Sequence, residues 1–229
     1  MSAGSTTSAQ KAAALYDRSY AERYRAHDDT LATSGPYLGF VAWLQGACAR
    51  FAGSIDVLEL GCGTGRYFSA LPNARTITGI DASAPMLELA KAPYRADQIR
   101  AERIDLVQGD LLTHPFTDGS FDLVYSIGVL AEHAPLTRAV VDRVARMLRR
   151  GGRFAFSTVH PESPSIAATP GRTVGRLIAP VLPGPLGRPV RDRLLAGGMY
   201  ADEQFINEVL NGRFEVESLE RFVSEAHLH

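Results

Sequence analysis

The sequence is poor in lysine, and it has no long apolar run. Only Lys11 and Lys91 are lysines, and the net charge is −1. No global charge therefore draws the chain toward nucleic acid or a membrane surface. No apolar run is long enough to span a bilayer, and residues 1–10 lack the pattern of a secretory signal. We therefore expect a cytoplasmic protein with no membrane span and no nucleic-acid partner. The bias toward arginine is typical of GC-rich bacterial genomes.

Cysteine is equally scarce, with only Cys48 and Cys62 in 229 residues. Cys62 lies inside a glycine-rich turn that a disulfide would distort, so we expect two free thiols in a reducing compartment. The chain is 45% hydrophobic, which is enough to bury a core, and its length suits one domain with an insert.

A dense glycine turn follows an apolar run at residues 57–60. Gly61, Gly63 and Gly65 occupy alternate positions, and the next residues can begin a helix. Glycine lets the backbone adopt positive φ and approach a ligand closely. A strand, a glycine turn and a helix form the nucleotide-binding corner of doubly wound α/β sheets. The sequence therefore predicts a nucleotide site at this turn.

Two features of the turn disfavour a dinucleotide. The dinucleotide pattern needs a glycine where Arg66 stands. Glu59, at the end of the apolar run, would repel a pyrophosphate at the helix N-terminus. A carboxylate there suits an ammonium or a sulfonium, and S-adenosylmethionine (SAM) carries both and no phosphate.

Five segments in order resemble the motifs of class I SAM-dependent methyltransferases. They are residues 59–65, 80–87, 108–111, 115–126 and 147–154. The similarity covers roughly residues 55–160 in the family's order. The resemblance implies a SAM-binding, Rossmann-like domain that catalyses methyl transfer.

The alternation of strands and helices predicts an α/β fold with a doubly wound, mostly parallel sheet. The strands are expected at 55–60, 75–80, 104–108, 121–126 and 153–159. The helices are expected at 11–29, 37–51, 64–71, 84–92, 135–149 and 202–211.

The family closes its seven-stranded sheet with two further strands. One strand is expected near 213–223, and the other is not evident. We divide the chain into a disordered tail (1–10), an N-terminal helical cap (11–52) and a methyltransferase domain (53–229). The proline-rich stretch 161–200 interrupts that domain and is expected to be a lid after the fifth strand.

The resemblance assigns cofactor contacts to three groups of residues. Those near the methionine half of SAM are Glu59, Gly61, Cys62, Gly63 and Gly65, with Tyr16 or Tyr24 reaching its carboxylate. Those near the ribose are Asp81, which follows Gly61 by 20 residues, and Ala82. Those near the adenine are Met86, Asp110 and Leu111, and Ser126 follows the fourth strand.

Each assignment has a structural alternative. Asp81 could cap a helix, Asp110 could be a turn residue, and Glu59 could be a solvated strand end. Met86 and the tyrosines at helical spacing could be core residues.

His133 and His160 are the candidate catalytic residues. The resemblance implies His133, because many small-molecule methyltransferases of this type carry a histidine there, and His160 ends the fifth strand at the ligand edge of the sheet. A histidine is suited to removing a proton at neutral pH. The alternative for His133 is a hydrogen-bonded loop histidine. No metal site is predicted.

The sequence favours a methyltransferase that acts on an O, N or C nucleophile of a small organic molecule in bacterial biosynthesis. No Asn-Pro-Pro-Tyr or Asp-Pro-Pro-Tyr follows the fourth strand, which weighs against a nucleic-acid base as substrate. Three alternatives stay open: an RNA methyltransferase that uses the arginines of the 161–200 stretch, a SAM-binding protein without catalysis, and an NAD-linked oxidoreductase. A homodimer is also open.

Overall fold

The computed structural model describes residues 7–28, 30, 34–160, 163, 200–221, 223–224 and 227–228. The chain divides into two compact units, each made of two segments. Unit 1 comprises Met1–Ile127 and Arg146–Phe156, and unit 2 comprises Gly128–Ala145 and Ser157–His229. The predicted lid, apart from Ser163 and Tyr200, lies outside the described residues.

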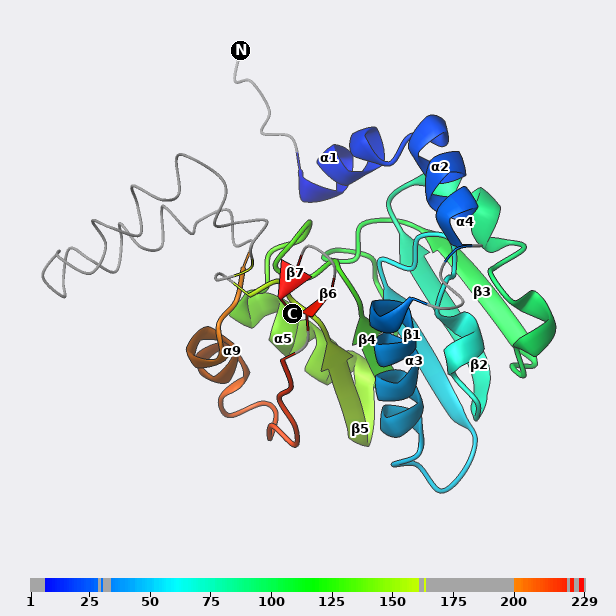
Figure 1. Ribbon diagram of the computed structural model, residues 1–229. Helices are drawn as coiled ribbons and strands as arrows, with labels where there is room; N and C mark the ends of the chain where they lie inside the picture. Colours follow the sequence, from blue (N-terminus) through cyan, green and yellow to red (C-terminus); the bar gives the residue numbers. More distant parts are fainter. Residues whose placement is uncertain are drawn as a thin grey trace, which may run out of the picture. The chain divides into compact units, whose positions relative to one another are not determined.

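Unit 1 is built on a sheet of five parallel strands (Figure 1). The strands are β1 (Ile55–Leu60), β2 (Ala74–Asp81), β3 (Arg103–Gln108), β4 (Phe121–Ser126) and β5 (Leu148–Phe156). Their order is β3-β2-β1-β4-β5, so the direction of winding reverses between β1 and β4. Ligands of open α/β sheets bind at the carboxyl ends of the strands at such a reversal. The predicted α/β class and parallel sheet are confirmed.

The two central strands have the bounds that their apolar runs predict. All six residues of β1 are buried, and five of the six residues of β4 are. Continuous burial is typical of parallel strands that are covered on both faces. The described residues do not extend this sheet beyond five strands, so the predicted seven-stranded closure is not observed among them.

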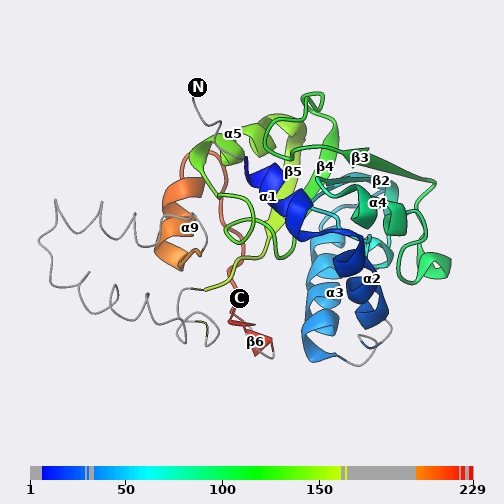
Figure 2. The same ribbon diagram turned by 90° about the horizontal axis from the view of Figure 1, so that it is seen from above.

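The helices of unit 1 cover one side and one edge of the sheet. They are α1 (Ser8–Leu15), α2 (Arg18–Asp28), α3 (Gly35–Cys48) and α4 (Ala84–Ala90), with short 3-10 turns η2 (Phe68–Ala70) and η3 (Ala96–Gln98). α2 packs against α4, and α3 against η2 and β5. Figure 2 shows α3 along one side of the sheet.

Two helix predictions in unit 1 are wrong in detail. The predicted helix 11–29 is two helices, because Asp17 accepts a 2.8 Å hydrogen bond from Tyr20 N and starts a new helix. The first of them begins at Ser8, capped by Thr7, so residues 8–10 are not a disordered tail. The predicted helix 64–71 is a series of turns ending in η2. Gly65, near the start of that range, has a φ of +72°, which a right-handed helix does not allow.

The junction of α5 (Arg138–Met147) and β5 also differs from the prediction. The helix ends two residues early, and the strand begins at Leu148 rather than at 153. Gly151 has a φ of +77° where the pairing of β4 and β5 shifts register. The Gly151-Gly152 pair therefore forms a bulge inside a strand and does not cap the helix.

Unit 2 contains the first part of α5, the helix α9 (Glu203–Leu210) and the strands β6 (Val223–Ser224) and β7 (His227–Leu228). β6 and β7 form a separate antiparallel pair. The predicted strand at 213–223 is wrong, because residues 214–221 have no regular structure. Val216 and Leu219 in this stretch are exposed, so its alternating pattern buries no apolar face.

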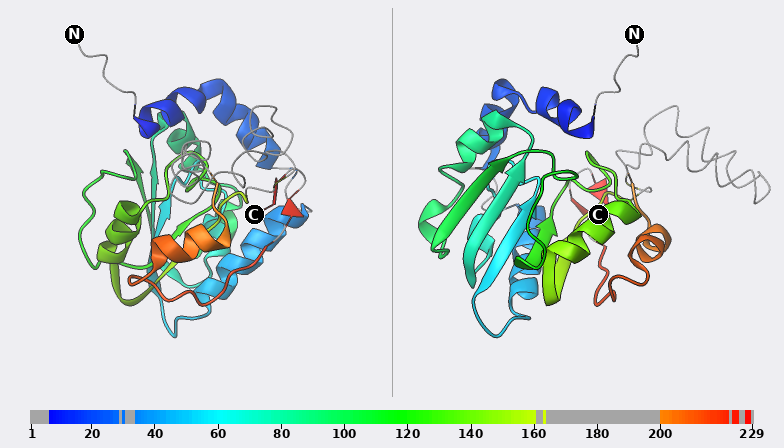
Figure 3. Two further views of the ribbon diagram at one scale, coloured as in Figure 1. Left: turned by 90° about the vertical axis from the view of Figure 1, so that its left-hand side faces the viewer. Right: turned by 180° about the vertical axis from the view of Figure 1, so that it is seen from behind.

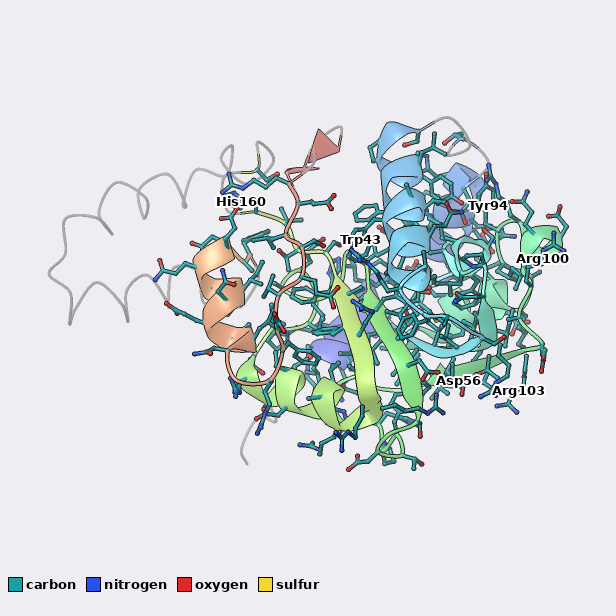
Figure 4. All side chains as sticks on the ribbon, turned by 90° about the horizontal axis from the view of Figure 1, so that it is seen from below. Trp43, Asp56, Tyr94, Arg100, Arg103 and His160 are labelled. Atoms are coloured by element: carbon teal, nitrogen blue, oxygen red, sulfur yellow. The ribbon has the colours of Figure 1, made fainter. Side chains whose placement is uncertain are left out.

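A charged cluster joins four strands near their amino ends, at the side marked by Asp56 in Figure 4. Asp56 accepts hydrogen bonds from Arg75 (2.5 Å), Thr76 (2.7 Å) and Arg149 (2.9 Å). Arg149 also donates to Asp122 at 2.6 Å. Burial alone would raise the pKa of Asp56, but these donors outweigh it and lower the pKa to about 2.

Candidate cofactor site

The glycine turn connects the carboxyl ends of β1 and β2. Gly61 N and Cys62 N donate to Ile80 O at 2.8 and 3.0 Å. Asp81 accepts from Gly63 N at one carboxylate oxygen and from Ser83 N at the other, both at 2.8 Å. Ser83, not Asp81, caps α4. Asp81 therefore joins the turn to the segment before α4, and the alternative in which it caps the helix is wrong.

The three glycines of the turn all have positive φ, at 76°, 52° and 72°. A Cβ atom on Gly65 would lie 2.7 Å from the Phe68 ring, and one on Gly63 would lie 3.3 Å from the Met86 methyl group. Glycine is thus required at residue 65 by packing as well as by backbone conformation.

Glu59 is a buried carboxyl group at this edge, with 2% of the residue exposed. Its Oε2 accepts a 2.7 Å hydrogen bond from the Tyr125 hydroxyl. Burial raises the pKa of Glu59 to about 8, the Asp81 charge adds to the increase, and Tyr125 and Arg66 oppose it. A buried acid of this kind ionises readily only when a cation lies beside it. Glu59 therefore suits a positively charged ligand group.

Arg66 links the turn to α2. Its Nε donates to Asp28 Oδ1 at 2.5 Å, and its guanidinium carbon lies 3.8 Å from the centre of the Tyr24 ring. Asp28 is fully buried and also accepts from Thr64 Oγ1 at 3.3 Å. Neither Asp28 nor Thr64 was singled out from the sequence, because residues 28 and 66 are too far apart for any local pattern to join them.

Tyr16 and Tyr24 lie on different helices, and their roles in the fold differ. Tyr16 ends α1, and its carbonyl oxygen accepts from Ser83 Oγ at 2.5 Å. This bond ties α1 to the carboxyl edge of the sheet, above which it runs in Figures 1 and 3. Burial raises the pKa of Tyr24 to about 12, so its hydroxyl stays protonated.

The other candidate cofactor residues also lie in unit 1. Ser126 Oγ is buried and donates to Leu60 O at 2.9 Å, which ties β4 to β1. Asp110 accepts from Leu112 N at 2.8 Å in a turn after β3. Cys62 and Met86 are buried, while Ala82 and Leu111 are half-buried. Cys48 and Cys62 are free thiols, as predicted.

Both candidate catalytic histidines belong to unit 2. His133 lies in a tight loop in which Glu132, His133 and Ala134 all donate backbone hydrogen bonds to Val129 O, and Ala131 has a φ of +59°. Burial lowers the pKa of His133, so its neutral form dominates at pH 7.

Glu132, which sequence reasoning left aside, is the neighbour of His133. Burial raises the pKa of Glu132 to about 7. Its Oε1 is buried without a hydrogen-bond partner among the described residues. Its adjacency to His133 was the one signal in the sequence.

His160 is 7% exposed and lies beside α9 (Figure 4). Its Nε2 is 3.6 Å from Glu203 Oε2. Glu203 also pairs with Arg221. His160 thus faces an acidic side chain of unit 2 that is itself paired with an arginine.

Residues 58–156 match the model of a methyltransferase domain family. This segment is similar to class I, Rossmann-like SAM-dependent methyltransferase domains in family match and in fold, and we call it the methyltransferase domain. The match covers β1 to β5, and hence the glycine turn, Glu59 and Asp81.

Curated relatives of this methyltransferase domain include a demethylmenaquinone methyltransferase of Lactiplantibacillus plantarum, 35% identical over 51% of each chain. An O-methyltransferase of Aspergillus nomiae is 34% identical over 44% of this chain and 45% of its own. A phthiotriol/phenolphthiotriol dimycocerosates methyltransferase of Mycobacterium tuberculosis is 33% identical over 54% of this chain and 47% of its own. The chain spans about half the length of the curated relatives it matches.

Among solved structures, a candidate SAM-dependent methyltransferase from Methanococcus maripaludis matches with a TM-score of 0.58 and 19% identity, over all of this chain and 94% of its own. A candidate methyltransferase from Bacillus halodurans matches with a TM-score of 0.57 and 22% identity, over 80% of this chain and 71% of its own. At these identities the matches support the fold of the methyltransferase domain.

The residues of the methyltransferase domain fit the cofactor that its family implies. SAM combines a sulfonium, an ammonium and a carboxylate, and the glycine turn brings together a buried acid, Glu59, and a largely covered cation, Arg66, whose side chain is 12% exposed. Within the described residues, no group of three histidine, cysteine or acidic side chains could hold a metal ion. No helix in the described ranges is long and apolar enough to cross a membrane.

Proposed function

We propose that the protein transfers a methyl group from SAM to an O, N or C nucleophile of a small organic molecule, in the cytoplasm of a bacterium and as a step of biosynthesis. The observation that carries the proposal is the buried Glu59 carboxyl group at a glycine turn, at the winding reversal of the sheet. That combination favours a cationic adenosyl ligand over a phosphate.

Every candidate cofactor residue except Tyr16 and Tyr24 has a role in this proposal. Glu59 faces the amino group of SAM, with Gly61, Cys62, Gly63 and Gly65 along the methionine half. Asp81, with Ala82 beside it, accepts from the ribose hydroxyls. Its two backbone hydrogen bonds fix the carboxylate without using all of its lone pairs. Asp110, Leu111 and Met86 surround the adenine, and Ser126 holds the end of β4 in place.

SAM supplies an electrophilic methyl group, so the main task of the protein is to align the nucleophile. Alignment of this kind can remove roughly 7–11 kcal/mol from a barrier. His133, neutral at pH 7, is the candidate base for a hydroxyl substrate. His160 is the weaker candidate because it already faces Glu203.

The substrate class rests on the relatives. Their names point to a quinone precursor and to a lipid, which are largely apolar molecules. We propose the same broad class here.

Calorimetry with S-adenosylhomocysteine (SAH) tests the first half of the proposal. Folded protein should release or absorb heat with SAH and none with NADH. The absence of heat with SAH, or binding of NADH alone, would overturn the proposal. Transfer of labelled methyl groups to a panel of quinols, phenols and amines tests the second half. SAH binding with no transfer would favour the non-catalytic alternative, and transfer to RNA alone would favour the RNA alternative.

A further inference from the structure

Arg66 holds an unused hydrogen-bond donor next to the glycine turn. Its side chain is 12% exposed. Its Nη2 atom is buried, and no hydrogen-bond acceptor lies within reach of it in the part of the chain that the structure describes. Buried donors in folded proteins nearly always meet an acceptor from the protein, from water or from a ligand. An acceptor supplied by a ligand would complete this site.

The guanidinium plane of Arg66 is fixed from two sides before any ligand arrives. Asp28 accepts from Nε at 2.5 Å, and the Tyr24 ring lies 3.8 Å from the guanidinium carbon. Thr64 donates to the same Asp28 carboxylate and so holds it in position. Asp28 accepts from Nε alone, so the hydrogens of Nη2 are left for another partner.

Arg66 and Glu59 bring opposite charges to the same turn. Glu59 stands two residues before Gly61, and Arg66 stands directly after Gly65. They are close enough for the Arg66 charge to lower the pKa of Glu59 against the effect of burial. A ligand that carries an ammonium and a carboxylate on one carbon atom complements this pair.

We propose that Arg66 Nη2 binds the α-carboxylate of SAM and SAH while Glu59 faces the amino group. The inference rests on the proposed cofactor. The contact with the SAM carboxylate, which the sequence predicted for Tyr16 or Tyr24, is thereby assigned to Arg66. The Tyr24 ring instead packs against the guanidinium group of Arg66. Asp28 and Tyr24 are then positioning residues that act through Arg66.

Calorimetry with two ligands tests this role without an activity assay. SAH carries both groups, and 5′-deoxy-5′-(3-aminopropylthio)adenosine keeps the amine and lacks the carboxylate. Arg66→Gln should weaken SAH binding by about 10- to 100-fold, as expected for a hydrogen bond to a charged group. It should change the affinity for the carboxylate-free ligand by less than about threefold. Glu59→Gln is the matched control, because it should weaken both ligands by similar factors.

Two further variants keep the test decisive if Arg66→Gln leaves Asp28 unpaired and the protein fails to fold. Asp28→Asn combined with Arg66→Gln removes both charges of the pair, and Arg66→Lys keeps the charge without the fork. Near-ultraviolet circular dichroism checks the fold of each. Either variant should show the same selective loss of affinity for SAH. An equal loss of both ligands would mean that Arg66 only holds α2, and would overturn the inference. If the unaltered protein bound neither ligand, the proposed cofactor itself would be wrong and the inference with it.

Discussion

The Tyr125 hydroxyl donates a 2.7 Å hydrogen bond to Glu59 Oε2 between the neighbouring strands β4 and β1. Both residues are buried. This bond favours the ionised form of Glu59, while burial favours the neutral form. The balance gives Glu59 a pKa of about 8, so an adenosyl ligand with an ammonium group meets a carboxyl group that is mostly protonated at pH 7.

SAH binding should therefore tighten as the pH rises. Between pH 6.5 and 8.5 we expect roughly a 20-fold decrease in Kd, because Glu59 must release its proton to face the ligand ammonium. Calorimetry in buffers of different ionisation enthalpy should also detect proton release at pH 7. Tyr125→Phe should move the pH dependence upward. In Glu59→Gln the dependence should disappear, and a Kd that still follows pH in this variant would assign the titration to another group.

The same group should make stability depend on pH. The pKa of Glu59 is raised from its ordinary 4.5 to about 8 in the folded protein, so the folded state holds a proton that the unfolded state releases. The free energy of unfolding should thus fall between about pH 4.5 and 8, by up to ~1.4 kcal/mol per pH unit. Urea unfolding at several pH values measures the slope. Glu59→Gln should flatten it, and parallel slopes in the two proteins would contradict the assignment.

Gly65 and Gly119 form a matched pair for testing the turn. Both have positive φ, at 72° and 64°, but a Cβ atom would clash with Phe68 only at residue 65. Gly119→Ala should cost about 1–2 kcal/mol for the left-handed conformation alone. Gly65→Ala should cost roughly 2–4 kcal/mol, because overpacking adds to that strain. Thermal and urea unfolding compare the two, and equal losses would show that the Phe68 ring moves aside freely.

The stability of the sheet at the amino ends of its strands should depend on Asp56. Asp56→Asn removes the carboxylate that Arg75, Thr76 and Arg149 share. Because both arginines are partly exposed, we expect a loss of only about 1–3 kcal/mol in unfolding free energy at pH 7. The pKa of Asp56 is lowered to about 2, so this stability is present above pH 4 and is lost as the pH falls toward 2. SAH affinity should not change, since the cluster lies at the opposite end of the strands from the glycine turn.

The core of unit 1 could be predicted from the sequence because the patterns that define it are local. The apolar run of β1, the glycine turn and the carboxylate at residue 81 fall within 30 residues, and each reports its own conformation. The limits of α5 and β5 were harder to predict. Gly151 could end a helix or bulge a strand, and only its pairing with β4 decides between them.

Contacts between segments that are far apart in the chain could not be predicted from the sequence. The pairing of Asp28 with Arg66 depends on how α2 packs, and no local pattern in either segment predicts this contact. The stretch 214–221 shows the converse error, since its alternation mimics a strand that finds no partner there. Local periodicity reports which face could be buried, but burial requires a partner surface.

The loop at residues 129–134 offers two candidate bases, and their pKa values separate them. Burial lowers the pKa of His133 and raises the pKa of Glu132 to about 7. If His133 is the base for a hydroxyl substrate, His133→Gln should lower kcat roughly 10²–10⁴-fold and leave the Kd of SAH unchanged. The rate should then rise with pH only below 6.5 and stay level above it. Glu132→Gln is the control. A kcat that rises through pH 7 and collapses in Glu132→Gln, but not in His133→Gln, would transfer the role to the carboxyl group.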